Sequence, residues 1–172
     1  MPGENAVNKT DDPALTLLAA ELGRRLLLHN LKLATAESCT GGWVAKCITD
    51  IAGSSDWFDR GFVTYSNHAK SAMLGVAEKT LAEQGAVSEA AVREMAMGAL
   101  AHSQATVAVA VSGIAGPGGA AIGKPVGTVW IAWAGKKRDS VSAKHLFSGD
   151  REGIRRQAVA TALQGLLKYL NA

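Results

Sequence analysis

The sequence has few cysteines, no long apolar run and no clustered metal ligands, and each absence excludes a class of protein. Its two cysteines, Cys39 and Cys47, form no CxxC pair and accompany no histidine cluster, so we expect neither a structural metal site nor a disulfide framework. No run of about 18 apolar residues is present to span a bilayer. The first dozen residues also lack the apolar segment of a signal peptide. These absences predict a cytoplasmic protein that binds no membrane, metal or cofactor.

The sequence is also only mildly basic. Its net charge of +3 comes from 18 Lys and Arg against 15 Asp and Glu, and the basic residues are dispersed except at 136–138 and 151–156. This pattern favours a small anionic substrate and argues against a nucleic-acid partner. The cluster at 136–138 can equally be a solvated turn with no ligand.

The length and composition predict one globular domain. An apolar fraction of 48% with 19% charged residues excludes disordered and fibrous classes. A chain of 172 residues is long enough to bury a core. We expect residues 1–12 to form a flexible N-terminal tail and residues 13–172 to form the domain. We also expect a homo-oligomer, a dimer or larger.

Apolar periodicity predicts helices interspersed with strands. The first helix opens at Asp12, the expected N-cap, and Pro13, and it carries leucines at helical spacing as far as Leu26. Further helices are expected at 43–51, 78–84, 88–103 and 151–170. Strands are expected at 31–36, 58–65, 106–111, 126–134 and 139–147, the last two forming an antiparallel hairpin. The order predicts an α/β fold, a three-layer α/β/α domain with a mixed, mostly parallel sheet.

Two polar, glycine-rich loops, 37–42 and 112–119, follow predicted strands. In an open α/β sheet, ligands bind beyond the carboxyl ends of the strands, so both loops are expected to face one site. Ser38 precedes a predicted helix start, where unpaired N–H groups can hold a phosphate or an oxyanion. The alternative is that Ser38 or Thr40 is an ordinary N-cap.

A serine nucleophile requires a base, and lysine is the candidate here. None of the four histidines lies in a recognisable triad context. Tyr65 and Lys70 follow a predicted strand and can lie at the same sheet edge as Ser38. A desolvated lysine can lose its proton near neutral pH and then accept one from a serine. The alternative is that Lys70 is a solvated residue at a helix start.

The second loop and the last helix offer binding groups. Glycines 113, 116, 118 and 119 permit positive φ and close backbone approach to a ligand, although such loops are often plain surface turns. Asp150 can cap the last helix. Arg151, in its first turn, is electrostatically unfavourable for that helix and is therefore expected to serve an anion, with Arg155 and Arg156 as less certain companions.

Six motifs give the chain a family resemblance. They are AESCTGG (36–42), GFVTYSNHAK (61–70), GAVSE (85–89), SGIAGP (112–117), KPVGTVW (124–130) and GDREGIRRQA (149–158). In this order they resemble the C-terminal domain family of the competence/damage-inducible protein CinA, over about residues 15–170. Single-domain members of that family are nicotinamide-nucleotide amidohydrolases.

The resemblance implies a Ser-Lys hydrolase that deamidates nicotinamide mononucleotide. The expected catalytic residues are Ser38, Lys70 and Tyr65. The expected substrate-binding residues are Cys39, Thr40, Gly41, Gly42, Asn67, Ser112, Gly113, Gly116 and Arg151. Two positions depart from the family pattern: His68 stands where an acidic residue is common, and Ser112 where threonine is common, which keeps the hydroxyl.

Two alternatives to this hypothesis stay open at this point. Cys39 could be the nucleophile, because a thiol at a helix N-terminus has a lowered pKa. The domain could also be a noncatalytic module that binds a nucleotide or a partner.

Overall fold

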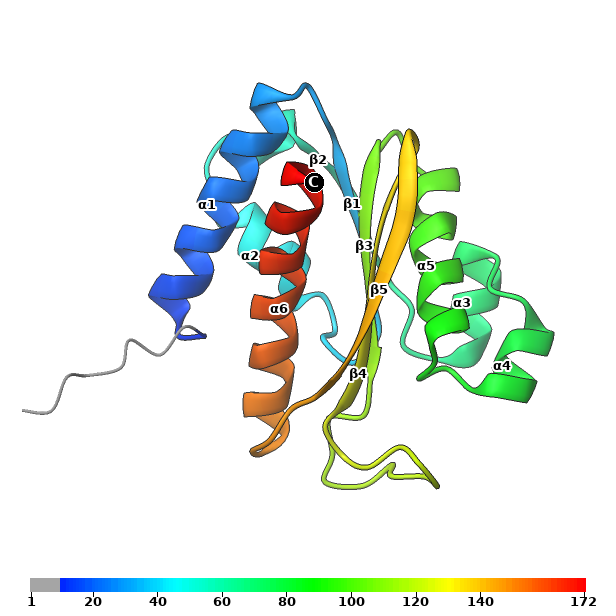
Figure 1. Cartoon of the computed structure of the whole chain (residues 1–172). Helices are drawn as coiled ribbons and strands as arrows, with labels where there is room; N and C mark the ends of the chain where they lie inside the picture. The colour runs from blue at the N-terminus through cyan, green and yellow to red at the C-terminus, as the bar shows by residue number, and fades with distance from the viewer. Residues whose placement is uncertain (1–9) are drawn as a thin grey trace, which may run out of the picture.

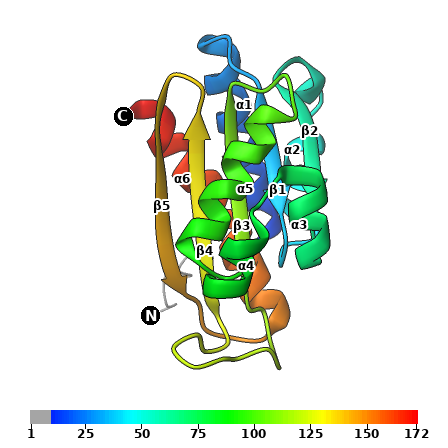
Figure 2. The same ribbon diagram turned by 90° about the vertical axis from the view of Figure 1, so that its right-hand side faces the viewer.

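The computed structural model describes residues 10–172, which form three layers with a five-stranded sheet in the middle. The helices on one face are α1 (Asp12–Leu28), α2 (Trp43–Thr49) and α6 (Arg151–Asn171) (Figure 1). Those on the other face are α3 (Asn67–Leu74), α4 (Glu78–Gln84) and α5 (Glu89–Ala101) (Figure 2). Among the described residues, no helix is long and apolar enough to cross a membrane.

The sheet is mixed, as expected. Its strands are β1 (Leu33–Glu37), β2 (Phe58–Val63), β3 (Val107–Gly113), β4 (Thr128–Gly135) and β5 (Arg138–Leu146), in the order β2-β1-β3-β4-β5. The β1 strand pairs in parallel with β2 and β3, whereas β4 pairs antiparallel with β3 and β5. Four strands therefore run in one direction and β4 runs against them. Parallel and antiparallel pairings are equal in number.

The two faces of the sheet carry side chains of different size. On the face toward α1 and α6, β3 presents Val107, Val109 and Val111, which pack in a core of leucines and tryptophans. On the opposite face the strands present mainly alanines, against which α5 packs. Successive residues of a strand point to opposite faces, so this difference follows from the alternation of valine and alanine in β3. Small side chains allow α5 to lie close to the sheet.

A glycine also brings α5 close to α3. A Cβ added to Gly98 of α5 would overlap the carbonyl oxygen of Leu74, the last residue of α3. Only glycine permits this approach, and it fixes the position of the helix that carries Lys70.

Most predicted elements are confirmed, with local corrections. The helix at Glu78–Gln84 has the predicted bounds, and Ser88 and Asp150 are N-caps. The cap of α1 is Asp11, not Asp12. Helix α3 was expected only in the alternative that placed Lys70 at a helix start, and that alternative is wrong in making Lys70 solvated, because the residue is buried. Of the expected tail, residues 1–9 lie outside the described part of the chain, and residues 11 and 12 belong to the start of α1.

Candidate active site

Ser38 and Lys70 meet at the carboxyl edge of the sheet. Ser38 directly follows β1, and Lys70 lies in the first turns of α3, which follows β2. The amine Nζ of Lys70 is 3.0 Å from the hydroxyl Oγ of Ser38. Only 1% of the lysine surface and 8% of the serine surface are exposed to solvent. The two groups are therefore in direct contact and almost free of bulk water.

The rest of the lysine amine is held by backbone carbonyls. Nζ donates to the carbonyl oxygen of Thr64 at 2.8 Å and of Tyr65 at 3.4 Å. A neutral amine has two N–H donors and one lone pair, so the two carbonyls can take the donors while the lone pair faces Ser38 Oγ. In residues 10–172 no carboxylate forms an ion pair with this amine.

Burial lowers the pKa of Lys70 below its usual value. Desolvation disfavours the charged ammonium, and the nearby Cys39 thiol opposes the shift. The positive charge of Arg151, which would also disfavour an ammonium nearby, is not among the causes of the lowered Lys70 pKa. The environment therefore makes the neutral amine, the form that can accept a proton, easier to reach than in a free lysine.

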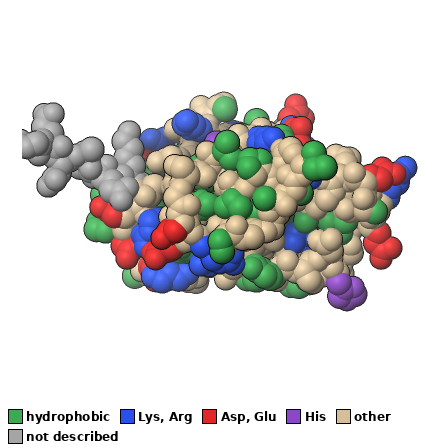
Figure 3. All heavy atoms as spheres, turned by 90° about the horizontal axis from the view of Figure 1, so that it is seen from below, with side chains coloured by type: hydrophobic (Ala, Val, Ile, Leu, Met, Phe, Trp, Pro, Cys, Tyr) green, Lys and Arg blue, Asp and Glu red, His purple; other side chains and the backbone are tan. Residues whose placement is uncertain are grey.

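A small pocket opens beside the pair. Its volume is about 220 Å³, and it is lined by Ser38, Cys39, Tyr65, Asn67, Lys70, Ala86, Val87, Ser112, Gly113, Ala115 and Arg151. Of the expected site residues, Thr40, Gly41, Gly42 and Gly116 do not line it. Ala86, Val87 and Ala115 were not expected there. Figure 3 shows this end of the molecule, where apolar side chains gather near the middle and Lys and Arg side chains lie among and around them.

Glu37, which was not singled out from the sequence, organises the turn that carries Ser38. Its buried carboxylate accepts from Thr40 Oγ1 at 2.7 Å, from Val44 N at 2.8 Å and from Ala45 N at 3.0 Å. Burial raises the pKa of this carboxyl, and these hydrogen bonds oppose the shift. The prediction that the N–H groups at the start of α2 are free for a phosphate or an oxyanion is therefore wrong. The N-cap is Gly42, and neither Ser38 nor Thr40.

Cys39 is unsuited to the role of nucleophile. Its thiol is buried, and burial raises its pKa to about 12. The lowered pKa expected for a thiol at a helix start is wrong, because desolvation outweighs any favourable dipole. At neutral pH this thiol stays protonated.

Arg151 bridges the two sides of the pocket. Its Nη1 donates to the carbonyl oxygen of Gly116 at 2.8 Å and its Nη2 to the hydroxyl of Tyr65 at 3.1 Å. Tyr65 thus contacts Arg151 through its hydroxyl and Lys70 through its carbonyl oxygen. Ser112 donates from its hydroxyl to the carbonyl oxygen of Ala86 at 2.8 Å, which ties β3 to the loop before α5.

The other expected arginines lie elsewhere. Arg155 donates to the backbone of the Ser38 turn, and Arg156 forms ion pairs with Asp12 and Glu152. In the second loop, Gly116 and Gly119 adopt positive φ, whereas Gly113 and Gly118 do not. Gly113 nevertheless lines the pocket.

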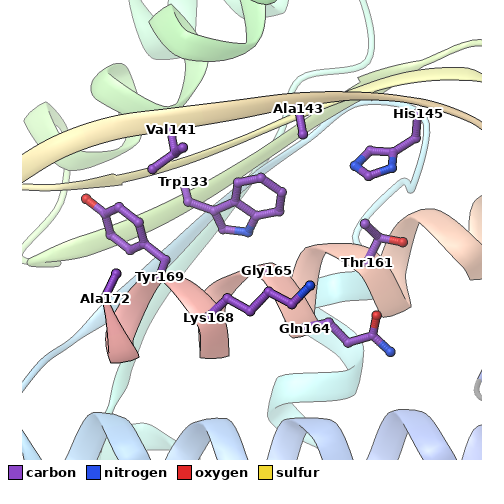
Figure 4. A pocket seen from close by; sticks show the side chains of 10 residues that line it. All are labelled: Trp133, Val141, Ala143, His145, Thr161, Gln164, Gly165, Lys168, Tyr169 and Ala172. Atoms are coloured by element: carbon purple, nitrogen blue, oxygen red, sulfur yellow. The ribbon is translucent and has the colours of Figure 1, made fainter.

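A second pocket, of about 380 Å³, lies between β5 and α6. Figure 4 shows the rings of Trp133 and Tyr169 in the space between this edge strand and the helix, with His145 at the other end. It contains no serine or cysteine. The candidate active site is therefore the pocket at Ser38.

Fold and site together define a three-layer α/β/α protein with a serine and a buried lysine paired at the carboxyl edge of its sheet. The chain belongs to the CinA C-terminal domain family, which matches residues 15–170.

Relatives and solved structures agree with this assignment. The nicotinamide-nucleotide amidohydrolase PncC of Escherichia coli (strain K12) is 57% identical over 155 residues, which cover 90% of this chain and 94% of that protein. The protein of the same name from Pseudomonas putida is 52% identical over 157 residues, covering 91% and 97%. The crystal structure of the competence/damage inducible protein CihA from Agrobacterium tumefaciens superposes with a TM-score of 0.89 at 45% identity, covering 94% and 97%.

Proposed function

We propose that this protein is an amidohydrolase that converts nicotinamide mononucleotide to nicotinate mononucleotide and ammonia through a Ser38 acyl-enzyme. The observation that carries the proposal is the 3.0 Å contact between the Ser38 hydroxyl and the buried Lys70 amine. The names of the PncC relatives support the substrate.

In the first half of the reaction, the lone pair of Lys70 takes the Ser38 hydroxyl proton as Oγ bonds to the carboxamide carbon. The C=O π electrons move to the oxygen and form a tetrahedral oxyanion. Lys70 then gives its extra proton to the amide nitrogen, the C–N bond breaks and ammonia leaves. General acid–base catalysis of this kind contributes about 10²–10⁴-fold to the rate.

In the second half, water attacks the ester carbon while Lys70 takes one of its protons. The C–Oγ bond then breaks as the oxyanion re-forms its C=O bond, and Lys70 gives its proton to Ser38 Oγ. The carboxylic acid loses its remaining proton to solvent and leaves as the carboxylate. Lys70 is suited to both halves, because its lowered pKa allows the same amine to accept and return a proton.

The proposed oxyanion donor is the backbone N–H of Cys39, the residue of this turn that lines the pocket beside Ser38. Other N–H groups of the turn are occupied: Ser38 N donates to the carbonyl oxygen of Val111, and Gly41 N to that of Ser38. Within residues 10–172, no other residue accepts a hydrogen bond from the N–H of Cys39 or of Thr40. Donors of this kind, aimed at a developing negative charge, often supply the largest single contribution to catalysis.

The pocket size and charge support the choice of substrate. A volume of about 220 Å³ suits a single aromatic ring with its carboxamide, so the ribose phosphate would lie toward the pocket mouth. Arg151 is the exposed cation at that mouth, and a guanidinium fork suits a phosphate.

The test is ammonia release from nicotinamide mononucleotide by the purified protein, compared with nicotinamide, its riboside and NAD. We expect turnover of the mononucleotide, its loss in Ser38→Ala, and its retention in Cys39→Ala. Loss in Cys39→Ala alone would make the thiol the nucleophile. Binding of the mononucleotide without ammonia release by the wild type would instead indicate a noncatalytic nucleotide-binding module.

A further inference from the structure

Arg155 contacts the turn that carries the nucleophile. From α6, its Nε donates to the carbonyl oxygen of Cys39 at 3.0 Å and its Nη2 to that of Thr40 at 3.2 Å. A Cβ added to Gly41 would lie 3.4 Å from the same Nη2, so the guanidinium covers this turn closely. The planar group also lies over the indole of Trp43, 5.4 Å from its centroid. One rigid fork thus holds two successive carbonyls of the turn.

These contacts fix the direction of the backbone N–H groups. In a planar trans peptide the C=O and the N–H point in opposite directions. Because Arg155 holds the Cys39 carbonyl, the N–H of Thr40 in the same peptide points away from the arginine. The Ser38 carbonyl is held in turn by Gly41 N at 3.0 Å, which fixes the N–H of Cys39.

Thr40 is held from a second side by Glu37. Its hydroxyl donates to the buried Glu37 carboxylate at 2.7 Å, while Arg155 binds its carbonyl oxygen. The side chain and the backbone of one residue are therefore bound by an anion and a cation from different elements. Its N–H has no partner in another described residue.

We propose that Arg155 is a positioning residue that fixes the turn after Ser38, so that the N–H of Cys39 is ready for the oxyanion before substrate binds. Arg155 holds the Thr40 carbonyl, and the Gly41 N–H of that same peptide holds the Ser38 carbonyl. The Ser38 carbonyl shares its peptide with the N–H of Cys39, the residue that lines the pocket. The inference rests on the proposed amidohydrolase function and extends it. The guanidinium also draws electron density from the carbonyls that it binds, and a polarised peptide is a stronger N–H donor. Arg155 accordingly acts on the transition state through the backbone and has no contact with the substrate phosphate.

The experiment compares Arg155→Met and Arg155→Lys with Arg156→Met. Arg156 is the matched control, because it is the next residue of α6 and lies over the same Trp43 ring at 4.9 Å, yet it binds Asp12 and Glu152 and no atom of residues 38–41. We expect Arg155→Met to lower kcat on nicotinamide mononucleotide by about 10²-fold with little change in KM, since loss of one oxyanion donor costs about 10²–10³-fold. Arg155→Lys should restore part of this loss, because an ammonium can bind one carbonyl but not both. Arg156→Met should keep wild-type kcat.

A second substrate separates positioning from loss of folded enzyme. Thionicotinamide mononucleotide develops its charge on sulfur, a weaker hydrogen-bond acceptor, so it depends less on the N–H of Cys39. The quantity to compare is kcat/KM for nicotinamide mononucleotide divided by kcat/KM for its thio analogue. We expect Arg155→Met to lower this ratio. This ratio does not depend on the amount of active protein.

An unchanged kcat, a rise in KM alone or an unchanged substrate ratio in Arg155→Met would overturn the inference. A rise in KM alone would place Arg155 on the substrate. If the wild type releases no ammonia from the mononucleotide, the proposed function itself fails. If the wild type turns the mononucleotide over and Arg155→Met does so equally well, only the inference about Arg155 fails.

Discussion

The amine of Lys70 lies 3.0 Å from Oγ of Ser38, and no carboxylate of the described chain neutralises it. In the proposed mechanism, the protonation state of Lys70 therefore controls the rate of catalysis. We expect kcat/KM to rise with pH through an ionisation below the value of about 10.4 for free lysine, because burial lowers the pKa of Lys70. A pH–rate profile of ammonia release measures this ionisation. Lys70→Arg should be inactive at every pH, since a guanidinium does not deprotonate, whereas Lys46→Arg, at an exposed position on α2, should match the wild type.

The same burial predicts how stability depends on pH. Since the folded pKa of Lys70 is lowered, the unfolded chain binds more protons between the folded value and about 10.4, and this residue makes stability rise with pH across that window. Lys70→Met removes the titration. The free energy of unfolding of Lys70→Met relative to the wild type should therefore be greatest at low pH and fall as pH rises. Urea unfolding at a series of pH values tests this, and a difference that grows with pH would contradict it.

We expect Gly98→Ala to disturb the candidate active site, although Gly98 does not line its pocket. The new Cβ would overlap the Leu74 carbonyl, so α3 must shift and carry Lys70 with it. Overpacking of this kind costs about 1–3 kcal/mol, against a gain of about 1 kcal/mol from helix propensity. We expect lower thermal stability together with a lower kcat for the folded enzyme.

The matched control for this prediction is Gly165→Ala. A Cβ there would overlap the Trp133 ring in the core between β4 and α6, away from Ser38. This variant should lose stability and keep its kcat. Equal kcat losses in the two variants would show that the Gly98 effect is a general one and does not act through α3.

Arg151→Ala should raise KM for the mononucleotide by about tenfold or more, the value of a hydrogen bond to a charged group. The change should be much smaller for nicotinamide riboside, which lacks the phosphate. Steady-state kinetics on both substrates give the comparison, with Arg24→Ala as the exposed control. An equal rise for both substrates would assign Arg151 to the ring or the ribose.

Local sequence signals, namely helix caps and apolar periodicity, predicted most of the helices and strands. Ser88 and Asp150 are confirmed as caps because their side chains bind N–H groups three residues ahead. Apolar periodicity did not predict helix α3, because the helix buries only Lys70 and Leu74, which form no apolar stripe. Its position depends on the packing of Gly98, a contact between distant segments.

The same distinction between local and long-range signals applies to the residues of the site. Ser38 and Lys70 lie in sequence motifs, and the structure brings them together. Glu37 reaches seven and eight residues ahead to Val44 and Ala45, and Arg155 reaches back 116 residues to Cys39. Both residues lie in the motifs AESCTGG and GDREGIRRQA, but a motif does not reveal these contacts, since each depends on the shape of the turn after β1. For this reason the sequence indicated a free helix start where the structure has an occupied one.

The connection between β3 and β4 lies beside the candidate active site, because its residue Ala115 lines the pocket. Because β4 runs against β3, the connection at 114–127 returns to the sheet edge from which it departs. Its base is closed by hydrogen bonds from Ile114 N to the Thr128 carbonyl and from Gly127 N to the Ile114 carbonyl. Ile122, near its tip, is fully exposed. Residues can therefore be added or removed at this tip while the strand register and the contact between Ser38 and Lys70 stay in place.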